Sequence, residues 1–380
     1  MIVLLFLFIP LSHTQELIFV QAIWRNGETR TSTDFDYIQG SHLDYANSQL
    51  TERGINNSYN VGRVLRHRYI DESAFLSPVL RPKEMYLQSV DIEGPMMTSE
   101  AIGQGMFNSD DRLAPLPVAV HTKPIETDWM LAFKWNRCEQ LMREIQFLCP
   151  SFPNLFDIRD FNQLIEEGFI CSRVTEHSKY FKTSEQYSLL QHYAALEEAG
   201  VALPVGLSED IVNERRLINE KILRLLLGLG EYYNPRILRL TTGLLVDTLL
   251  EELLVKWKCT YSPRPYSYCI PSSNLKFRGI STQGFVLNSL LEVFNIREQA
   301  LEGSHTPHFN ALLLVELWNV NGEPRVRVLF RKDAYSRIVP MGPVKGCHRS
   351  LCPLDSFYNS CNDVRSTNPR RECQLPSQVV

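Results

Sequence analysis

The stretch "ELIFVQAIWRNGETRT" (residues 16–31) decides how the rest of the chain is interpreted. Its first half, "ELIFVQAI", is an apolar run that predicts a buried strand. The strand is followed by a turn containing Gly27, with Arg25 and Arg30 on either side. Such a turn at the end of a strand is a place where a phosphate pocket can be built. The position between Arg25 and Gly27, where a nucleophile is expected, holds Asn26.

The composition is that of an ordinary globular protein. The chain has 380 residues, of which 44% are hydrophobic and 22% are charged. This length is sufficient for one large domain or two modest ones. The formal net charge is −4 and no block of lysines or arginines occurs, so we expect no nucleic-acid partner.

The N-terminal segment resembles a secretion signal. Residues 1–14 contain an apolar run from Ile2 to Ile9, followed by small or polar residues that suit a cleavage site. We expect the mature protein to begin near Gln15; the alternative is a buried first strand. The run is too short to span a bilayer, and no later stretch reads as a membrane anchor. The sequence therefore predicts a protein that is secreted or held in the lumen of the secretory pathway, and the sequon at Asn56 predicts glycosylation.

Nine cysteines agree with an oxidising compartment. Spacing favours three disulfides, although connectivity does not follow from sequence: Cys347–Cys352, Cys259–Cys269 and Cys149–Cys171. An odd count leaves at least one cysteine free or bonded to another molecule, and Cys361 is the candidate.

We expect no metal and no cofactor. Neither a CxxC pair nor a second cluster at ligand spacing occurs, and His305 with His308 in "SHTPHF" is a weak metal pattern.

Strand patterns and helix patterns alternate at both ends of the chain, whereas the middle is helical. The strand patterns lie at residues 16–23, 84–90, 275–281, 310–319 and 325–333. The helix patterns lie at residues 48–70, 95–107, 207–228, 239–257 and 282–294, and "PLPVAVHTKP" (115–124) reads as extended. We therefore predict an α/β core formed by residues 15–125 and 237–345. An all-α insertion spans 126–236, and a disulfide-bearing tail spans 346–380.

Several segments occur in the order of a known family. These are "FVQAIWRNGETRT" (19–31), "QLTERGINNSYNVGRVLRHRY" (49–69), "PVAVHTKP" (117–124), "ALPVGLSED" (202–210), "GLLVDTLL" (243–250), "VEL" (315–317) and "CHRSLCPLDSF" (347–357). Together they resemble the histidine acid phosphatases, the branch that contains the prostatic and lysosomal enzymes. The resemblance covers nearly the whole mature chain. It implies a mixed, mainly parallel sheet flanked by helices, a homodimer, and a disulfide between Cys138 and Cys373.

The resemblance also implies a chemistry. In the family a histidine attacks phosphorus and is released from the phosphohistidine by water, which is covalent catalysis with an imidazole nucleophile. Arginines hold the phosphate oxygens and stabilise the charge of the transition state. A second histidine orients the phosphate, and the adjacent aspartic acid protonates the leaving alcohol.

Most of these groups are replaced in this chain. Arg25 retains the first arginine, but Asn26 stands at the nucleophile position. Thr29 stands at the second arginine of the loop, and Arg30 is displaced from it by one residue. Gln88 replaces the arginine that follows the second strand.

The later histidine–aspartate pair is replaced by Ser281 and Thr282, neither of which is a useful acid near neutral pH. We expect these replaced positions to converge beside Arg25 in a pocket of preserved shape. Arg30 and Arg278 are candidates for a basic patch beside it, although solvated surface charge is the simpler interpretation of Arg278.

The sequence thus predicts a secreted, catalytically inactive member of the family that acts by binding a ligand or a protein partner, for which a phosphorylated or anionic molecule is one candidate. Two alternatives remain. One is a weakly active acid phosphatase, and the other is a structural glycoprotein.

Overall fold

The computed structural model describes residues 15–29, 49–108, 117–132, 135–153, 167–171, 178–180, 182–183, 186, 208–261, 269, 274–304 and 306–374. The predicted signal (1–14), Arg30 and His305 lie outside these residues. Among the described residues, no helix combines the length and apolar character that crossing a bilayer would need.

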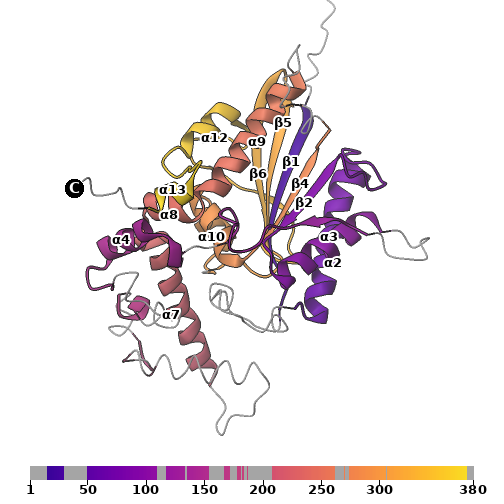
Figure 1. Cartoon of the computed structure of the whole chain (residues 1–380). Helices are drawn as coiled ribbons and strands as arrows, with labels where there is room; N and C mark the ends of the chain where they lie inside the picture. The colour runs from indigo at the N-terminus through magenta and orange to yellow at the C-terminus, as the bar shows by residue number, and fades with distance from the viewer. Residues whose placement is uncertain are drawn as a thin grey trace, which may run out of the picture.

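A mixed sheet forms the centre of the molecule (Figure 1). Its strands are β1 (Gln15–Arg25), β2 (Met85–Ser89), β3 (Val120–His121), β4 (Phe277–Thr282), β5 (Leu312–Val320), β6 (Glu323–Arg331), β7 (Val339–Pro340) and β8 (Cys352–Pro353). The order is β3-β2-β4-β1-β5-β6-β7, and β8 pairs with β6. Strands β3, β2, β4 and β1 are parallel, whereas β5 to β8 add antiparallel pairs. This is the predicted fold class.

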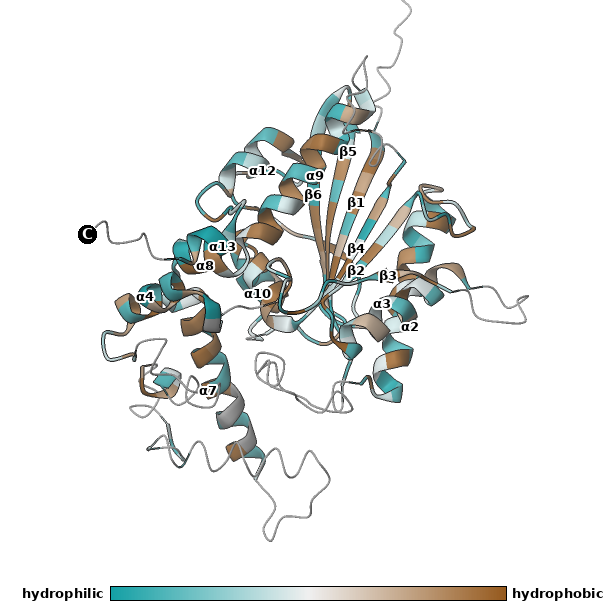
Figure 2. Cartoon of the chain, viewed as in Figure 1, coloured by the Kyte–Doolittle hydropathy of each residue, from teal (hydrophilic) through white to brown (hydrophobic). Residues whose placement is uncertain are grey.

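Helices cover both faces of the sheet. One face carries α2 (Glu52–Arg66), the π-helix η2 (His67–Glu72) and α3 (Glu93–Phe107). The other face carries α9 (Gly243–Tyr261) and α10 (Gly284–Val293). Successive residues of a strand point to opposite faces, so strands buried on both sides tend to be apolar, as β1 and β5 are over most of their length. Figure 2 shows this as mostly brown along β1 and β5, whereas β2 and β4 also carry teal and pale segments.

Helices α2 and α3 approach each other closely. Thr51 caps α2, because its hydroxyl accepts a hydrogen bond of 2.9 Å from the backbone N–H of Gly54. Further along, a Cβ at Gly62 would lie 2.1 Å from the carbonyl oxygen of Ile102, and one at Gly105 would lie 2.1 Å from that of Tyr59. Only glycine permits this contact between the two backbones.

The described residues of the range 126–236 contain helices and no strand. They include η3 (Trp135–Arg137), α4 (Glu139–Leu148), residues 167–171, α7 (Glu209–Leu227) and η6 (Gly230–Tyr232), followed by the start of α8 (Pro235–Thr241). The predicted boundaries of α7 are confirmed. The Ser208 side chain caps its first turn, and Gly228 ends it in the left-handed conformation with φ 66°.

Two sequence predictions differ from the structure. Residues 239–257 form the end of α8 and most of α9 rather than one helix, with a break at Thr242. The break brings Gly243 against the C-terminal segment, where a Cβ would lie 2.5 Å from the carbonyl oxygen of Val364. In the extended stretch 115–124, only Val120–His121 pairs as a strand among the described residues.

The structure contains three of the four disulfides that the sequence analysis named. Cys138–Cys373 has a Cα–Cα distance of 4.4 Å, and the other two are Cys149–Cys171 and Cys259–Cys269. The pair Cys347–Cys352 differs, because both residues are buried thiols in this structure. Burial, followed by the neighbouring Cys347 thiol, raises the pKa of Cys352 well above its usual range. Disulfides are compatible with the secretory pathway.

Cys361 is also a buried thiol, with none of its surface exposed. Burial raises the pKa of this thiol, which disfavours the reactive thiolate. A bond from Cys361 to another molecule, one of the two states that the sequence analysis left open, is therefore incompatible with the folded structure.

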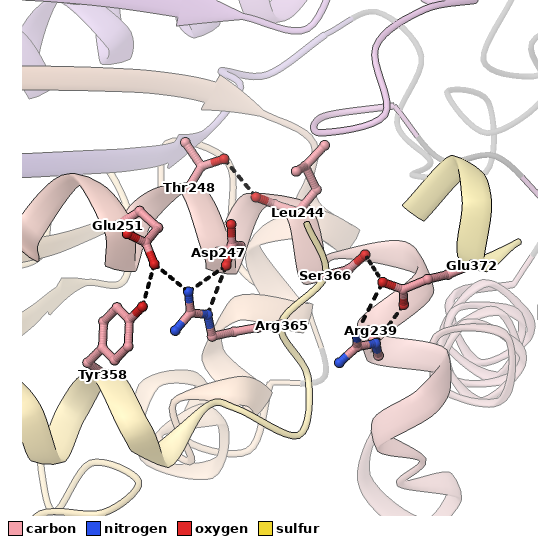
Figure 3. A network of polar contacts seen from close by, with 9 residues as sticks. All are labelled: Arg239, Leu244, Asp247, Thr248, Glu251, Tyr358, Arg365, Ser366 and Glu372. Atoms are coloured by element: carbon pink, nitrogen blue, oxygen red, sulfur yellow. Dashed lines mark hydrogen bonds and ion pairs between the residues drawn. The ribbon is translucent and has the colours of Figure 1, made fainter. Parts of the chain in front are cut away.

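Ion pairs attach the C-terminal segment to the core (Figure 3). Arg365 donates to Asp247 of α9 through Nε at 2.9 Å and through Nη2 at 2.6 Å, and Nη2 also lies 2.7 Å from Glu251. Nearby, Glu372 accepts from Arg239 of α8 at 2.6 Å. The segment carries α12 (Leu354–Ser360) and α13 (Pro369–Glu372); the remaining short helix, α11 (Arg297–Leu301), precedes β5.

Candidate active site

The carboxyl ends of β1 and β4 meet at one edge of the sheet. Arg25 is the register partner of Thr282, and the backbone N–H of Asn26 donates to the Thr282 carbonyl at 3.0 Å. At the end of β2, the N–H of Val90 donates to the Ser281 carbonyl at 3.2 Å. The fold therefore brings together Arg25, Asn26, Ser281 and Thr282, as the sequence analysis predicted for these four positions.

The guanidinium of Arg25 contacts the loop that precedes β5. Its Nη1 donates to the carbonyl oxygen of Pro307, and its central carbon lies 4.3 Å from the centroid of the Phe309 ring. Only 6% of Arg25 is exposed. A guanidinium against an aromatic ring is a favourable cation–π contact. Arg25, which the family resemblance led us to expect as a phosphate-binding residue, thus binds groups of its own chain.

Asn26 is completely buried. Its side-chain Nδ2 donates to the carbonyl of Gly27 at 2.9 Å, and its own carbonyl accepts from the N–H of Asn310 at 3.2 Å. Gly27 lies close to α2, because a Cβ there would be 2.7 Å from Ser58 Oγ. An amide nitrogen has no basic lone pair, so Asn26 has no group that can attack phosphorus.

The two residues at the end of β4 are also fully buried. The Ser281 hydroxyl donates to the Pro95 carbonyl of α3 at 2.7 Å. The Thr282 hydroxyl has no hydrogen-bond partner in the described part of the chain. Neither side chain can be cationic, and neither is an acid near neutral pH.

Arg278 does not join Arg25, and with 14% of its side chain exposed it is not a solvated surface charge either; Arg30, the other candidate for a basic patch, lies outside the described residues. Arg278 is the second residue of β4, four positions before Thr282, and therefore lies toward the other end of the strand. Its Nη1 lies 2.7 Å from Glu252 of α9, and its Nη2 donates to Gln88 Oε1 at 2.7 Å. Gln88 is thereby engaged with Arg278. Thr29 forms an isolated β-bridge with Leu50, and it is 4% exposed.

Comparison with known proteins also indicates a relationship to the acid phosphatases. No family model matches the chain. The chain is 25% identical to the testicular acid phosphatase of Homo sapiens over 397 residues, which cover 96% of this chain and 83% of that protein. It is 23% identical to the lysosomal acid phosphatase of Xenopus laevis over 396 residues, or 100% of this chain and 84% of that protein. The chain is related to the acid phosphatases.

The solved structures agree on the fold. A Hafnia alvei phytase in complex with tartrate superimposes with a TM-score of 0.58 at 16% identity, covering 95% of this chain and 99% of that one. The fold is that of the histidine acid phosphatases and phytases. Within it, Arg25, Asn26, Ser281 and Thr282 lie at the carboxyl ends of two parallel strands, which is where α/β folds usually bind ligands.

His308 is a titratable group near this edge whose role the sequence analysis left open. Burial lowers the pKa of His308, and the charges of Lys332 and Arg25 lower it further. Its Nε2 lies 3.1 Å from the Ser304 hydroxyl. His308 interacts with the charge of Arg25 because of the course of the loop before β5, which sequence spacing does not reveal. Among the residues that the structure describes, no cluster of His, Cys, Asp and Glu could hold a metal ion.

Proposed function

We propose that this chain is a non-hydrolytic member of the acid phosphatase family that acts by binding a ligand or a protein partner. The observation that carries this proposal is the buried amide of Asn26 beside Arg25, at the position that the resemblance assigns to the nucleophile. Ser281 and Thr282 stand where the family's histidine and acid are expected.

Magnitudes support the proposal. Removal of a nucleophile that acts as part of a catalytic unit costs on the order of a million-fold in rate. Loss of a general acid alone costs about a hundred- to ten-thousand-fold. The two losses do not add, but either is sufficient to remove turnover that would matter physiologically.

The surroundings of Arg25 indicate the kind of ligand. An arginine at 6% exposure next to the buried, unsatisfied hydroxyl of Thr282 provides a positive charge and a hydrogen-bonding group. A small anion, including a phosphorylated one, would satisfy both groups. Such an anion must first displace the Pro307 carbonyl or the Phe309 ring from the guanidinium. We therefore expect anion binding at this position to be weak.

A turnover assay tests the proposal. Purified protein is incubated with p-nitrophenyl phosphate between about pH 4 and 7, a range that spans carboxyl and imidazole titration. A lysosomal acid phosphatase prepared in parallel shows that the assay works. We expect no release of nitrophenol above the background. Turnover that Arg25→Ala abolishes would overturn the proposal.

The weakly active alternative is favoured by one observation, namely that His308 is close enough to Arg25 for their charges to interact. If His308 supplied a nucleophile or a proton, His308→Ala would remove any measurable hydrolysis. Hydrolysis that survives this change would come from another group of the chain or from a contaminating enzyme, and only the former would be lost in Arg25→Ala.

We further propose that the protein is secreted, glycosylated at Asn56 and dimeric. The disulfides support secretion, and the exposed position of Asn56 on α2 supports its glycosylation. The family resemblance supports the dimer. Expression in secretory cells followed by N-terminal sequencing tests secretion. A mobility shift that is lost in Asn56→Gln tests glycosylation. Sedimentation measures whether the protein is a dimer. Absence of any ligand for the pure protein would favour the structural-glycoprotein alternative.

A further inference from the structure

A short segment before β5, residues 306–310, lies against the guanidinium of Arg25; we call it the strap. Within the strap, the carbonyl of Pro307 accepts a hydrogen bond from Arg25 Nη1. The ring of Phe309 lies 4.3 Å from the guanidinium carbon of the same arginine. His308 stands between these two contacts in the sequence. The only histidine of the strap is therefore carried by the part of it that covers Arg25.

The ends of the strap have the backbone geometry of hinges. Gly303, just before the strap, has φ 84°, and Asn310 at its end has φ 61°, so both are left-handed. Residues at the ends of a loop can absorb the changes in dihedral angle that let the loop move. Two backbone hydrogen bonds keep the strap in place. The N–H of Asn310 donates to the Asn26 carbonyl at 3.2 Å, and that of Ala311 donates to the His308 carbonyl at 3.0 Å.

The surroundings of His308 disfavour a proton on its ring while the strap is in place. Burial of part of the ring lowers the pKa of His308, the charges of Lys332 and Arg25 lower it further, and Asp333 raises it by less than these effects together. Arg25 ends β1, whereas Lys332 and Asp333 follow β6. Lys332 also pairs at 3.2 Å with Glu302, whose side chain is 70% exposed and therefore largely screened by water.

The polar contacts around the imidazole do not reverse this preference. Nε2 of His308 lies 3.1 Å from the Ser304 hydroxyl, which can donate to a neutral ring or accept from a protonated one. Asp333 Oδ1 accepts hydrogen bonds of 2.8 Å from the N–H groups of both Tyr335 and Ser336, so this oxygen serves its own loop. His308 retains exposed surface, through which protons reach it from the solvent.

A conformation that binds a proton poorly loses stability as pH falls, relative to one that binds it well. With the strap lifted, His308 has the ordinary pKa of about 6.5, so the closed form is favoured above this pH and is progressively lost below it. We propose that residues 306–310 form a pH-operated cover of Arg25, which is closed at neutral pH and is released when His308 takes up a proton. The proposal rests on the proposed function for its consequence, because the covered arginine is the one expected to bind an anion. The movement itself needs no ligand.

Amide hydrogen exchange measures the movement directly, in the peptide that contains Asn310 and Ala311. Wild-type protein and His308→Gln are compared at the same pH, so that the intrinsic dependence of exchange on pH cancels. We expect equal exchange at about pH 7.5 and, at about pH 5.5, exchange at least about threefold faster in the wild type, because glutamine takes up no proton. His67→Gln is the matched control and should behave as the wild type does, because it changes an exposed histidine of η2. Equal exchange of wild type and His308→Gln at both pH values would overturn the proposal.

Sulfate, which stays doubly charged across this range, tests whether the cover controls anion binding. In calorimetric titrations we expect the wild type to bind sulfate at least about threefold more tightly at pH 5.5 than at pH 7.5, and His308→Gln to lose this difference. Faster exchange without any sulfate binding would support the strap and count against the anionic ligand of the proposed function. Tighter sulfate binding with unchanged exchange would overturn the strap, because the charge of His308 would then act on the anion directly.

Discussion

The central guanidinium carbon of Arg25 lies 4.3 Å from the centre of the Phe309 ring, and this contact holds the loop before β5 over the end of β1. Arg25 also donates to the carbonyl of Pro307 in that loop. Because both contacts involve the arginine expected to hold phosphate, the chain itself occupies the surroundings of that residue. Anion binding here is therefore in competition with an internal contact.

Removal of the Phe309 ring should increase anion binding. In Phe309→Ala one face of the guanidinium is uncovered, and we expect inorganic phosphate to bind at least about threefold more tightly than it binds to the unmodified protein. Isothermal titration calorimetry measures this. Phe75→Ala is the matched control, since it removes a ring from beside a cation, Lys276, at the opposite edge of the sheet. Equal phosphate affinities in all three proteins would show that Phe309 does not restrict Arg25.

Restoration of the nucleophile alone should not restore hydrolysis. Asn26→His supplies an imidazole, but the second and third arginines and the acid would still be absent at Thr29, Gln88 and Thr282. We expect no release of nitrophenol from p-nitrophenyl phosphate. The comparison is a variant in which the family's residues are restored at all five positions, 26, 29, 88, 281 and 282. Substantial turnover by Asn26→His alone would show that the other four positions are dispensable.

Much of this fold follows from local patterns in the sequence. Apolar runs marked β1, β4, β5 and β6, and a serine cap with a terminal glycine marked both ends of α7. The break between α8 and α9 was missed, because Gly243 is required by a contact with Val364, far along the chain. Long-range contacts of this kind leave no periodic signal in the sequence.

The candidate site was predictable to a similar extent. The strand order brings Arg25, Asn26, Ser281 and Thr282 together, which collinear motifs could indicate. The direction of a long side chain depends on its partners instead. Arg278 faces Glu252 and Gln88, and no local pattern reveals that pairing.

The disulfide between Cys138 and Cys373 should stabilise the protein considerably. It joins residues 235 positions apart, and the chain-entropy model gives about 4 to 5 kcal/mol for loops of this size, although measured values are often lower. We expect Cys138→Ser with Cys373→Ser to lower the free energy of unfolding in urea by about 2 to 5 kcal/mol. The short-loop pair Cys259–Cys269, changed in the same way, should cost less. Equal losses for the two pairs would contradict an effect of loop length.

Arg365 should contribute more to stability than an exposed arginine does. Its side chain is 14% exposed and that of Asp247 is 12% exposed, so Arg365→Met leaves a largely buried carboxylate without its cation. We expect a loss of about 2 to 3 kcal/mol in the free energy of unfolding. Arg53→Met is the control, because the Arg53–Glu28 pair is at the surface and should contribute less than about 1 kcal/mol. The prediction is wrong if the two variants unfold at the same urea concentration.

The same network should make the free energy of unfolding depend on pH in the acidic range. Burial would raise the pKa of Glu251, but hydrogen bonds from Tyr358 and Arg365 outweigh it and lower that pKa below its ordinary value of 4.5. A carboxyl group with a lowered pKa stabilises the folded state above its unfolded pKa, and this stabilisation is lost as pH falls through the folded pKa. The stability difference between Glu251→Gln and the unmodified protein should therefore shrink as pH falls below about 4.5. A difference that is constant between pH 6 and about 3 would contradict this assignment.

The three buried thiols should be protected in the folded protein. Burial raises the pKa of both Cys352 and Cys361, so little thiolate is present, and neither side chain is accessible. Iodoacetamide at about pH 8 should leave the native protein unmodified and should add three groups per chain after unfolding in urea, as counted by mass spectrometry. Only one added group would show that Cys347 and Cys352 are bonded to each other.

The bond between Cys138 and Cys373 has a consequence for proteolysis. A single cut at any peptide bond between these two residues leaves both fragments joined covalently through the sulfur atoms. A nicked molecule therefore retains its mass in the absence of a reducing agent and separates into two pieces only when one is added. Cleavage within the helical region consequently need not release α4 or α7 from the sheet, and a nicked molecule can remain one particle.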